Sequence, residues 1–338
     1  MPPAIVHSDE ARVWEYRCIL FTSHATSGWK PGIHFAGDLR CERLPAHNLG
    51  IAHQLGDRLI MEPTNLPITA ETCVVRNTNA GKGRSRSIAP GTTAARHLHY
   101  GRIILDSADE SVRFSTAEQE VSLICLGGSA TVSAEGNVYK LGRYDSLYIP
   151  RDSEVEVAPG SEGCDFAEVS SPVANRYPIQ LVRFADVQKD PTLHFKAGGS
   201  TAEREVNILI GKNVEAGRLL AGITFSKPGN WTSWPPYEHA EMLEEAYLYV
   251  DMPAPGWGIQ LVYTDPGKPE LVAVVREGDC VLMPKGYHPN VAAPGGAINF
   301  LWMMAANREG EDRQFGVVNV QPEYAAGGSG LEASRATR

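Results

Sequence analysis

Two stretches of the sequence concentrate the side chains that proteins use to hold a transition metal. The first, residues 229–247, contains His239 followed by the adjacent carboxylates Glu244 and Glu245. The second, residues 278–290, contains His288. Imidazole nitrogens combined with one carboxylate suit a divalent ion such as Zn, Mn or Fe. We therefore interpret the two stretches as parts of one metal site.

The elements that must position these groups are β-strands. From about Tyr100 onward, short apolar segments alternate with turns rich in Gly and Pro, which favours an all-β fold of antiparallel strands. Residues two apart on a strand share a face, and successive strands of a small barrel line one interior. The pattern therefore allows side chains from distant segments to meet around one ion.

The strand pattern occurs twice. Residues 141–150 and 276–284 share a glycine, an acidic residue, an apolar strand and a terminating proline. Two similar antiparallel β-barrels in tandem are the simplest explanation. We expect an N-terminal barrel over residues 85–180, a C-terminal barrel over 181–323 and a disordered tail over 324–338.

The N-terminal part of the chain differs from the rest. Residues 1–60 contain five of the ten histidines, yet their apolar residues keep no regular period for long. We expect an irregular extension over residues 1–84. A further hypothesis is that translation begins at Met61.

The N-terminal barrel is predicted to hold no metal. Residues 151–154, which follow the strand ending at Pro150, contain no histidine. His97 and His99 precede the strand pattern that starts at about Tyr100, and we interpret them as surface residues. The first barrel is therefore expected to be structural.

In order and spacing, the two metal-binding stretches resemble the paired motifs of the cupins. These motifs are a glycine before His-x-His and Glu, then Gly-x5-Pro-x-Gly followed by His. The resemblance implies a bicupin, two double-stranded β-helices in tandem, with His239, Glu245 and His288 as metal ligands. Glu244 competes with Glu245 for the carboxylate role. Glu245 is favoured because a strand-like segment follows it and the resemblance aligns it there.

Three further segments narrow the resemblance to one family. Residues 231–236, 244–249 and 281–289 are similar to the 5-deoxy-glucuronate isomerases of inositol catabolism. Residues 249–252 and 300–303 look more like the sister 5-keto-4-deoxyuronate isomerases of pectin breakdown. The resemblance covers roughly residues 85 to 320. It implies a ketol-isomerase of sugar acids with one divalent metal, as zinc, manganese or iron, in the C-terminal barrel.

The sequence departs from the family pattern at one ligand position. Tyr237 stands where the family has the first histidine of His-x-His. Tyr237 could bind the ion as a phenolate, could leave a position open to water or substrate, or could mark a relative with weakened metal binding. We favour the open site with three ligands.

The isomerase hypothesis needs further groups beside the ion. A cation must hold the substrate carboxylate, and a base must move a proton between neighbouring carbons. Lys285, three residues before His288, is the candidate for the cation or for an acid. Arg204 is a second candidate for substrate binding, and Trp231 is a candidate pocket wall.

Two other classes of function remain open. Two histidines and one carboxylate also form the facial triad of non-haem Fe(II) oxygenases. A non-catalytic bicupin that binds a small ligand is the third hypothesis.

The composition excludes some partners. The chain has 338 residues, 43% of them hydrophobic, and a net charge of −9, which argues against nucleic-acid and anionic membrane surfaces. The six cysteines are scattered, and the sequence shows no signal peptide and no apolar run of membrane-spanning length. We expect a cytoplasmic enzyme that acts on a small sugar acid. We also expect a homo-oligomer, because cupins have sheet edges that a partner often covers.

Overall fold

The structure, a computed structural model, describes residues 66–239 and 241–328, all within the compact unit Leu59–Arg338. Strands dominate these residues, which confirms the all-β prediction. The helices are short: α1 (Ala70–Cys73), α2 (Phe184–Val187) and the 3-10 helix η1 (Pro322–Gly327). In the described residues, no helix has the length and apolar character that crossing a membrane requires. Met61, most of the predicted extension and residues 329–338 of the predicted tail lie outside the described residues.

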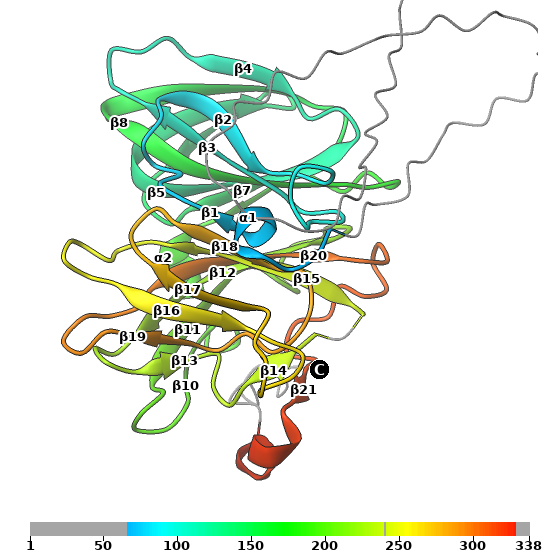
Figure 1. Cartoon of the computed structure of the whole chain (residues 1–338). Coiled ribbons are helices and arrows are strands. Elements are labelled where there is room, and N and C mark those ends of the chain that lie inside the picture. The colour runs from blue at the N-terminus through cyan, green and yellow to red at the C-terminus, as the bar shows by residue number, and fades with distance from the viewer. Residues whose placement is uncertain (1–65, 240, 329–338) are drawn as a thin grey trace, which may run out of the picture. The chain divides into compact units, whose positions relative to one another are not determined.

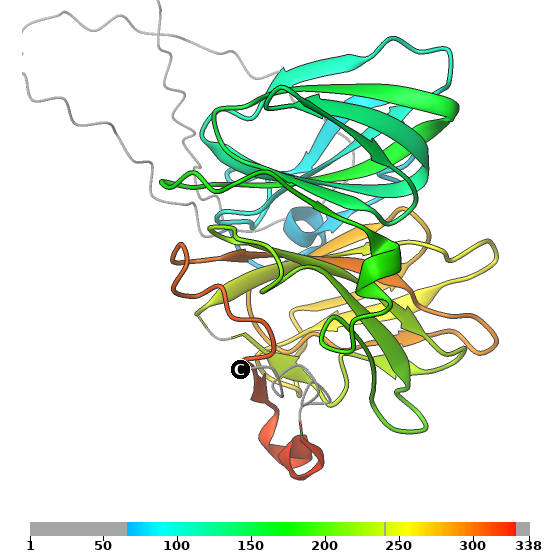
Figure 2. The same cartoon turned by 180° about the vertical axis from the view of Figure 1, so that it is seen from behind.

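The first half of the fold is one antiparallel sheet built around two long strands (Figures 1 and 2). Strand β5 runs beside β8 along most of its length, with register shifts near Gly127 and Gly128. The strand order is β2 (Gly83–Ile88), β3 (His99–Leu105), β8 (Glu154–Pro172), β5 (Gln119–Ala134), β7 (Ser146–Ile149) and β9 (Gln180–Val182), with β4 (Val112–Ser115) on β8 and β6 (Asn137–Leu141) on β5.

The second half contains a seven-stranded, a four-stranded and a two-stranded sheet, and none of its sheets closes on itself within the described residues. The seven-stranded order is β1 (Val74–Val75), β18 (Cys280–Met283), β15 (Leu243–Tyr249), β20 (Phe300–Ala306), β12 (Leu219–Ser226), β11 (Arg204–Ile210) and β10 (His194–Ala197). The four-stranded order is β13 (Trp231–Thr232), β19 (Asn290–Ala292), β16 (Gly258–Val262) and β17 (Leu271–Val275). Strand β14 (Tyr237–Glu238) pairs with β21 (Asn319–Val320).

Strand β1 connects the start of the described chain to the second half. Val74 lies opposite Val281 and Val75 opposite Cys280, at the edge of the seven-stranded sheet. These residues belong to the stretch assigned to the extension, so part of that stretch is a strand. Similarly, η1 includes the first residues of the stretch predicted as a disordered tail. The limits expected for the two barrels stay a prediction.

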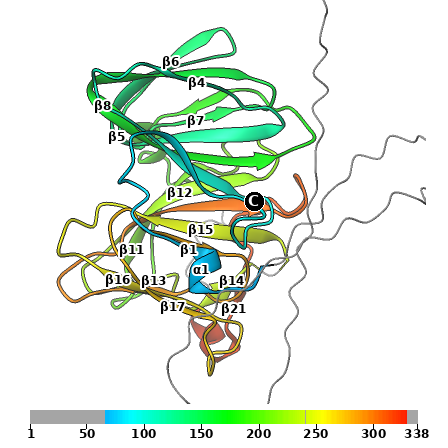
Figure 3. The ribbon, with the colours of Figure 1, turned by 45° about the horizontal axis from the view of Figure 1, so that its top comes forward.

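Burial patterns show where the core lies. Strand β17 alternates buried and exposed residues, as expected for a strand with one solvated face. Strands β15 and β20 are buried at every position. One face of each strand packs on the core of the second half, and the other face contacts the first half. Figure 3 shows β12 and β15 between the sheet of the first half and the strands of the four-stranded sheet.

Two buried glutamates join the halves in a reciprocal way. Glu120 on β5 accepts hydrogen bonds from the backbone N–H groups of residues 217–219, at 2.6 to 2.8 Å. Glu244 on β15 accepts three from residues 96–98, at 2.5 to 2.7 Å. Each half thus supplies one carboxylate to a loop of the other. These bonds hold β15, the strand that carries Glu245, against the first half.

Candidate metal centre

Three different segments bring His239, Glu245 and His288 together. His239 directly follows β14, Glu245 lies on β15, and His288 lies in the turn between β18 and β19. Because Glu245 pairs with Met283 at the end of β18, this turn begins beside the carboxylate. Gly286 makes the turn possible, since its φ is +91° and a Cβ there would lie 2.8 Å from a backbone oxygen.

The three side chains have the spacing of ligands to one ion. The Nε2 atoms of His239 and His288 each lie 3.0 Å from Oε2 of Glu245, and the ligand atoms of the group lie within 4.8 Å of one another. Two ligands about 2.1 Å from one ion, at right angles, are about 3 Å apart. The group therefore fits a single divalent ion. Within residues 66–239 and 241–328, it is the one group of this kind.

Hydrogen bonding leaves ring nitrogens available for an ion. Nδ1 of His288 donates to the carbonyl oxygen of Gly286 at 2.8 Å, so the lone pair lies on Nε2. That Nε2 is a buried atom without a hydrogen-bond partner, and Nε2 of His239 faces Oε2 of Glu245. An inward nitrogen oriented by a backbone carbonyl on the other ring atom is typical of metal-binding histidines.

Glu245 is held in its charged form. Burial raises the pKa of this carboxyl, but its contacts with His239 and His288 outweigh burial and lower the pKa below the ordinary value. The site therefore offers a carboxylate rather than a carboxylic acid. The structure also separates the two adjacent glutamates, because Glu244 is engaged by the three N–H groups of residues 96–98.

Tyr237 lies beside the two imidazoles. Its ring centroid is 5.6 Å from that of His239 and 5.1 Å from that of His288, with both pairs edge to face. Burial and the nearby charge of Glu245 raise the pKa of this phenol, which favours its neutral form. Tyr237, which stands where the family has a histidine ligand, is therefore part of the wall of the site.

A small pocket opens onto the metal group. Arg204 is 3% exposed and lines this pocket together with His239 and Glu245. Its Nη1 donates to the carbonyl oxygens of Ala202 and Trp234, each at 3.1 Å. The guanidinium is thus oriented beside the metal group. The rest of the wall is mainly apolar and aromatic, from Val206, Tyr247, Phe300, Trp302, Met304 and Phe315.

Two residues expected at the site lie elsewhere. Lys285 is exposed and lines a different cavity, together with Arg96, Glu241 and Glu270. It occupies the outer side of the turn whose inner side carries His288. Trp231 packs against Trp234, with ring centroids 5.0 Å apart, and is absent from the residues that line the metal pocket. Of the predicted substrate-binding and catalytic residues, the structure therefore brings only Arg204 to the metal group.

One polar pair in the pocket was missed at the sequence level. The hydroxyls of Ser233 and Tyr247 are 2.7 Å apart, and both residues line the pocket. Tyr247 follows Glu245 by two residues on one strand, so the period of the strand could have indicated it. Ser233 carried no such signal, because it lies in an irregular segment between β13 and β14.

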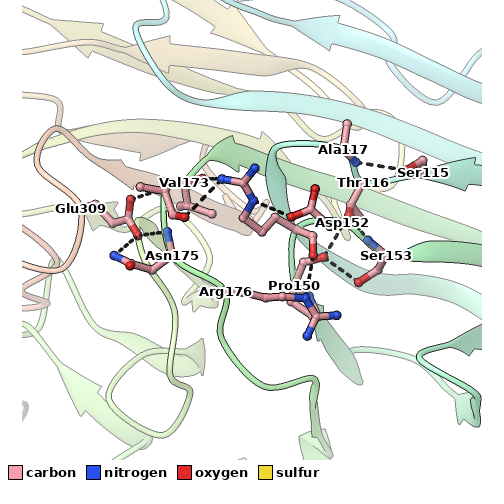
Figure 4. Close-up of polar contacts among 12 residues, drawn as sticks. Ser115, Thr116, Ala117, Pro150, Asp152, Ser153, Val173, Asn175, Arg176 and Glu309 are labelled. Carbon is pink, nitrogen blue, oxygen red and sulfur yellow. Dashed lines mark hydrogen bonds and ion pairs between the residues drawn. The ribbon is translucent and has the colours of Figure 1, made fainter.

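In the first half, the turn after β7 has a structural role (Figure 4). Within residues 150–154, the Ser153 hydroxyl donates to the carbonyl oxygen of Pro150 at 2.9 Å. Arg151 donates to the carbonyl oxygen of Val173 at 2.5 Å. These bonds fasten the turn to the segment that follows β8.

The pair His97 and His99 is more enclosed than expected. Both side chains are partly buried rather than on the open surface. Burial and neighbouring arginines lower the pKa of each ring to about 4. The interpretation as surface residues therefore holds only in part, because Glu244 binds the backbone of residues 96–98 and draws this segment against the second half.

Solved structures are similar to this fold. An IolB-like protein from Salmonella typhimurium LT2 has a TM-score of 0.67 at 24% identity, over 75% of this chain and 98% of that one. Bacillus subtilis oxalate decarboxylase, studied for its Mn(II) centres, has a TM-score of 0.54 at 11% identity, over 76% and 81%. At these identities the likeness concerns the fold.

Sequence relatives extend the comparison. The 5-deoxy-glucuronate isomerase of Geobacillus kaustophilus is 31% identical over 218 residues, covering 58% of this chain and 75% of that protein. The enzyme of the same name from Bacillus subtilis strain 168 is 27% identical over 228 residues, covering 62% and 82%. The model of the KduI/IolB family matches residues 74–321. The chain therefore belongs to the KduI/IolB family.

Proposed function

We propose that this protein is a metal-dependent isomerase that interconverts the aldose and ketose forms of a deoxy sugar acid, most similar in activity to 5-deoxy-glucuronate isomerase. The observation that carries the proposal is the convergence of His239, Glu245 and His288, of which His239 and Glu245 line one pocket with Arg204. Relatives named for this activity support the substrate class.

The proposed architecture is a bicupin with one metal-binding barrel. The reciprocal glutamates Glu120 and Glu244 support it, because they occupy matching places on β5 and β15. The likeness to oxalate decarboxylase supports the same fold class. We place the N-terminal barrel over residues 85–180 and the C-terminal barrel over 181–323.

The ion is proposed to have three protein ligands and positions open to substrate. Tyr237 borders these open positions as a neutral phenol. Zinc, manganese and iron all suit two imidazoles and a carboxylate. Such an ion, when bound, withdraws electron density from the carbonyl and neighbouring hydroxyl oxygens of a sugar.

The chain's own residues would bind and orient the sugar acid. Arg204 is the proposed partner of the substrate carboxylate, because a guanidinium matches two carboxylate oxygens with two parallel hydrogen bonds. Lys285, on the outer side of its turn, is less well placed for this role. Ser233 and Tyr247 present hydroxyls that can pair with sugar hydroxyls. Phe300 and Trp302 exclude water from the reacting carbons.

The decisive experiment combines metal quantification with an NMR assay. The purified protein should hold about one divalent ion per chain and should convert 5-deoxy-glucuronate. Conversion of 5-keto-4-deoxyuronate instead would assign the sister activity. His288→Ala should remove metal and turnover together. A metal-loaded protein inactive on both sugars would contradict the proposal.

Two other functions have distinct signatures. Oxygen consumption by the Fe(II)-loaded protein would favour the oxygenase hypothesis. Absence of a stoichiometric metal, with retained sugar-acid binding, would favour a non-catalytic bicupin.

We further propose that the enzyme acts in the cytoplasm, in inositol catabolism, as a homo-oligomer. The edge strand β17 supports the assembly, since Val272 and Val274 are 62% and 42% exposed on it. Light scattering should give a mass of at least two chains. Val272→Lys combined with Val274→Lys should reduce it.

A further inference from the structure

The metal pocket is too small for a sugar. It encloses only about 20 Å³ of open space, which is room for about one water molecule. Pockets that hold small organic ligands have volumes of about 300–1,000 Å³. A six-carbon sugar acid therefore needs part of the wall to move before it reaches Glu245 and Arg204.

Most of the wall belongs to continuous strands. Arg204 and Val206 lie on β11, Thr224 on β12, and Trp302 on β20, all within the seven-stranded sheet. Moving these residues would break ladders that run through the core. Phe315 and Gly316 are different, since they follow β20 and lie outside that sheet.

A fixed point precedes this part of the wall. Arg313 donates from Nε to the carbonyl oxygen of Leu219 at 2.8 Å and from Nη2 to that of Gly211 at 2.7 Å. Two residues later, Phe315 stacks on Trp302 with ring centroids 5.1 Å apart. The segment is therefore anchored up to Arg313, and its pocket-lining part begins directly afterwards.

Beyond Phe315, the described contacts of the chain include β14, Tyr263 and Trp234. Strand β21 pairs with β14 over two residues only, and the Gln321 N–H donates to the carbonyl oxygen of Pro236 at 2.9 Å. The Tyr263 hydroxyl donates to Oε1 of Gln321 at 2.8 Å. The Tyr324 ring packs edge to face against that of Trp234, with ring centroids 5.0 Å apart. These partners lie outside the seven-stranded sheet, so the contacts can break without unfolding the core.

The same segment covers the strand that leads to a metal ligand. Strand β21 lies beside β14 (Figure 1), and its Val320 lies opposite Tyr237, two residues before His239. Separation of β21 from β14 would therefore expose the edge of the strand that leads to His239.

We propose that residues 315–327 form a strap that closes the metal pocket and opens to admit the sugar acid, with the Tyr263–Gln321 hydrogen bond as its latch. The inference rests on the proposed function for the identity of the substrate. It assigns to the C-terminal segment control of access to the ion.

A reversible cross-link tests the strap. Glu238 and Asn319 are paired residues of β14 and β21, and paired antiparallel residues have Cα atoms about 4.5–5.5 Å apart, so Glu238→Cys with Asn319→Cys suits the Cα separation of a disulfide. Cys18 and Cys41 are replaced by serine in this protein and its controls. Oxidation should slow loss of the bound metal to a chelator by at least about tenfold, and should reduce turnover. A thiol reductant should restore both rates.

A second variant tests the latch in the opposite direction. Tyr263→Phe should speed metal loss by about fivefold, the factor that one hydrogen bond contributes to an opening equilibrium. Tyr287→Phe is the matched control, because its ring contacts Tyr263 at 5.6 Å from outside the strap. It should leave the rate unchanged.

The outcomes separate the strap from the proposed function. Equal metal loss in the oxidised and reduced cross-linked protein would overturn the strap. Slower metal loss without activity on either sugar would support the strap and contradict the isomerase. Should the protein hold no metal, hydrogen exchange across residues 237–247 replaces the metal readout. Slower exchange on oxidation supports the strap, and equal exchange overturns it.

Discussion

At the scale of single residues, the site depends on two adjacent glutamates with different tasks. Glu244 and Glu245 point to opposite faces of β15, because side chains alternate along a strand. One face meets the loop 96–98 of the first half, and the other meets His239 and His288. Replacing Glu244 with glutamine should therefore affect mainly stability, and replacing Glu245 with glutamine should affect mainly metal binding.

Glu245→Gln should abolish stoichiometric metal binding and lower kcat by at least about a thousandfold, since an amide is a weak ligand for a transition metal. Glu244→Gln is the matched control and should keep the metal in the folded protein. Metal analysis and circular dichroism of both variants check this. Retained metal in Glu245→Gln would remove this residue from the ligand set.

Tyr237→His should strengthen metal retention by about tenfold or more, because a fourth side-chain ligand becomes available beside His239 and His288. Competition with a chelator measures the change. Tyr237→Phe should leave affinity near that of the unaltered protein. A large loss in Tyr237→Phe would show that the phenol itself binds the ion.

Arg204→Lys should raise KM for the sugar acid by about tenfold to a hundredfold with metal content unchanged, because lysine offers a point charge without the paired donors of guanidinium. Steady-state kinetics and metal analysis test this together. Lys285→Ala is the control on the outer side of the turn. A larger KM effect in the control would return the carboxylate-binding role to Lys285.

At the scale of elements, β5 and β15 are the strands that join the halves. Each contributes a buried glutamate to three backbone N–H groups of the opposite half. A carboxylate that accepts several N–H bonds satisfies donors that would otherwise be buried without partners. The position of β15, and with it Glu245, therefore depends on the first half.

Glu120→Gln should lower the free energy of unfolding by about 2–4 kcal/mol, because an amide leaves some of the N–H donors of residues 217–219 without a charged acceptor. Denaturant unfolding measures it. Glu154→Gln, at an exposed position of β8, should change stability by less than about 0.5 kcal/mol. Equal stability of the two variants would contradict a stabilising role for the hydrogen bonds between Glu120 and residues 217–219.

At the scale of the whole molecule, one apolar core extends through the second half and into contact with the first. Ile124, Tyr148 and Val169 of the first half belong to the same cluster as the strands of the seven-stranded sheet. The partly buried His97 and His99 lie beside this contact. Unfolding of the described unit exposes them, so its stability depends on their protonation.

The pKa of His97 and His99 is about 4 in the folded protein and about 6.5 in a solvated chain. The unfolded state therefore takes up protons first, and stability falls as the pH drops from about 6.5 to about 4. Each histidine should contribute about 1–3 kcal/mol to this loss. Replacing both with asparagine should flatten the profile between pH 6.5 and 4.5 in denaturant titrations. An unchanged slope would contradict this.

The sequence by itself determined the strand class, because alternation along strands is a local pattern, and its resemblance to the cupin motifs indicated the three residues that meet at the metal group. It also indicated Arg204. It could not show that Lys285 lies outside the metal pocket, because the packing of β18 decides which side of the following turn faces inward. Nor could it show that residues 315–327 cover the site or that Glu244 clasps residues 96–98. Those contacts join segments far apart in the chain, and only the tertiary structure decides which of them meet.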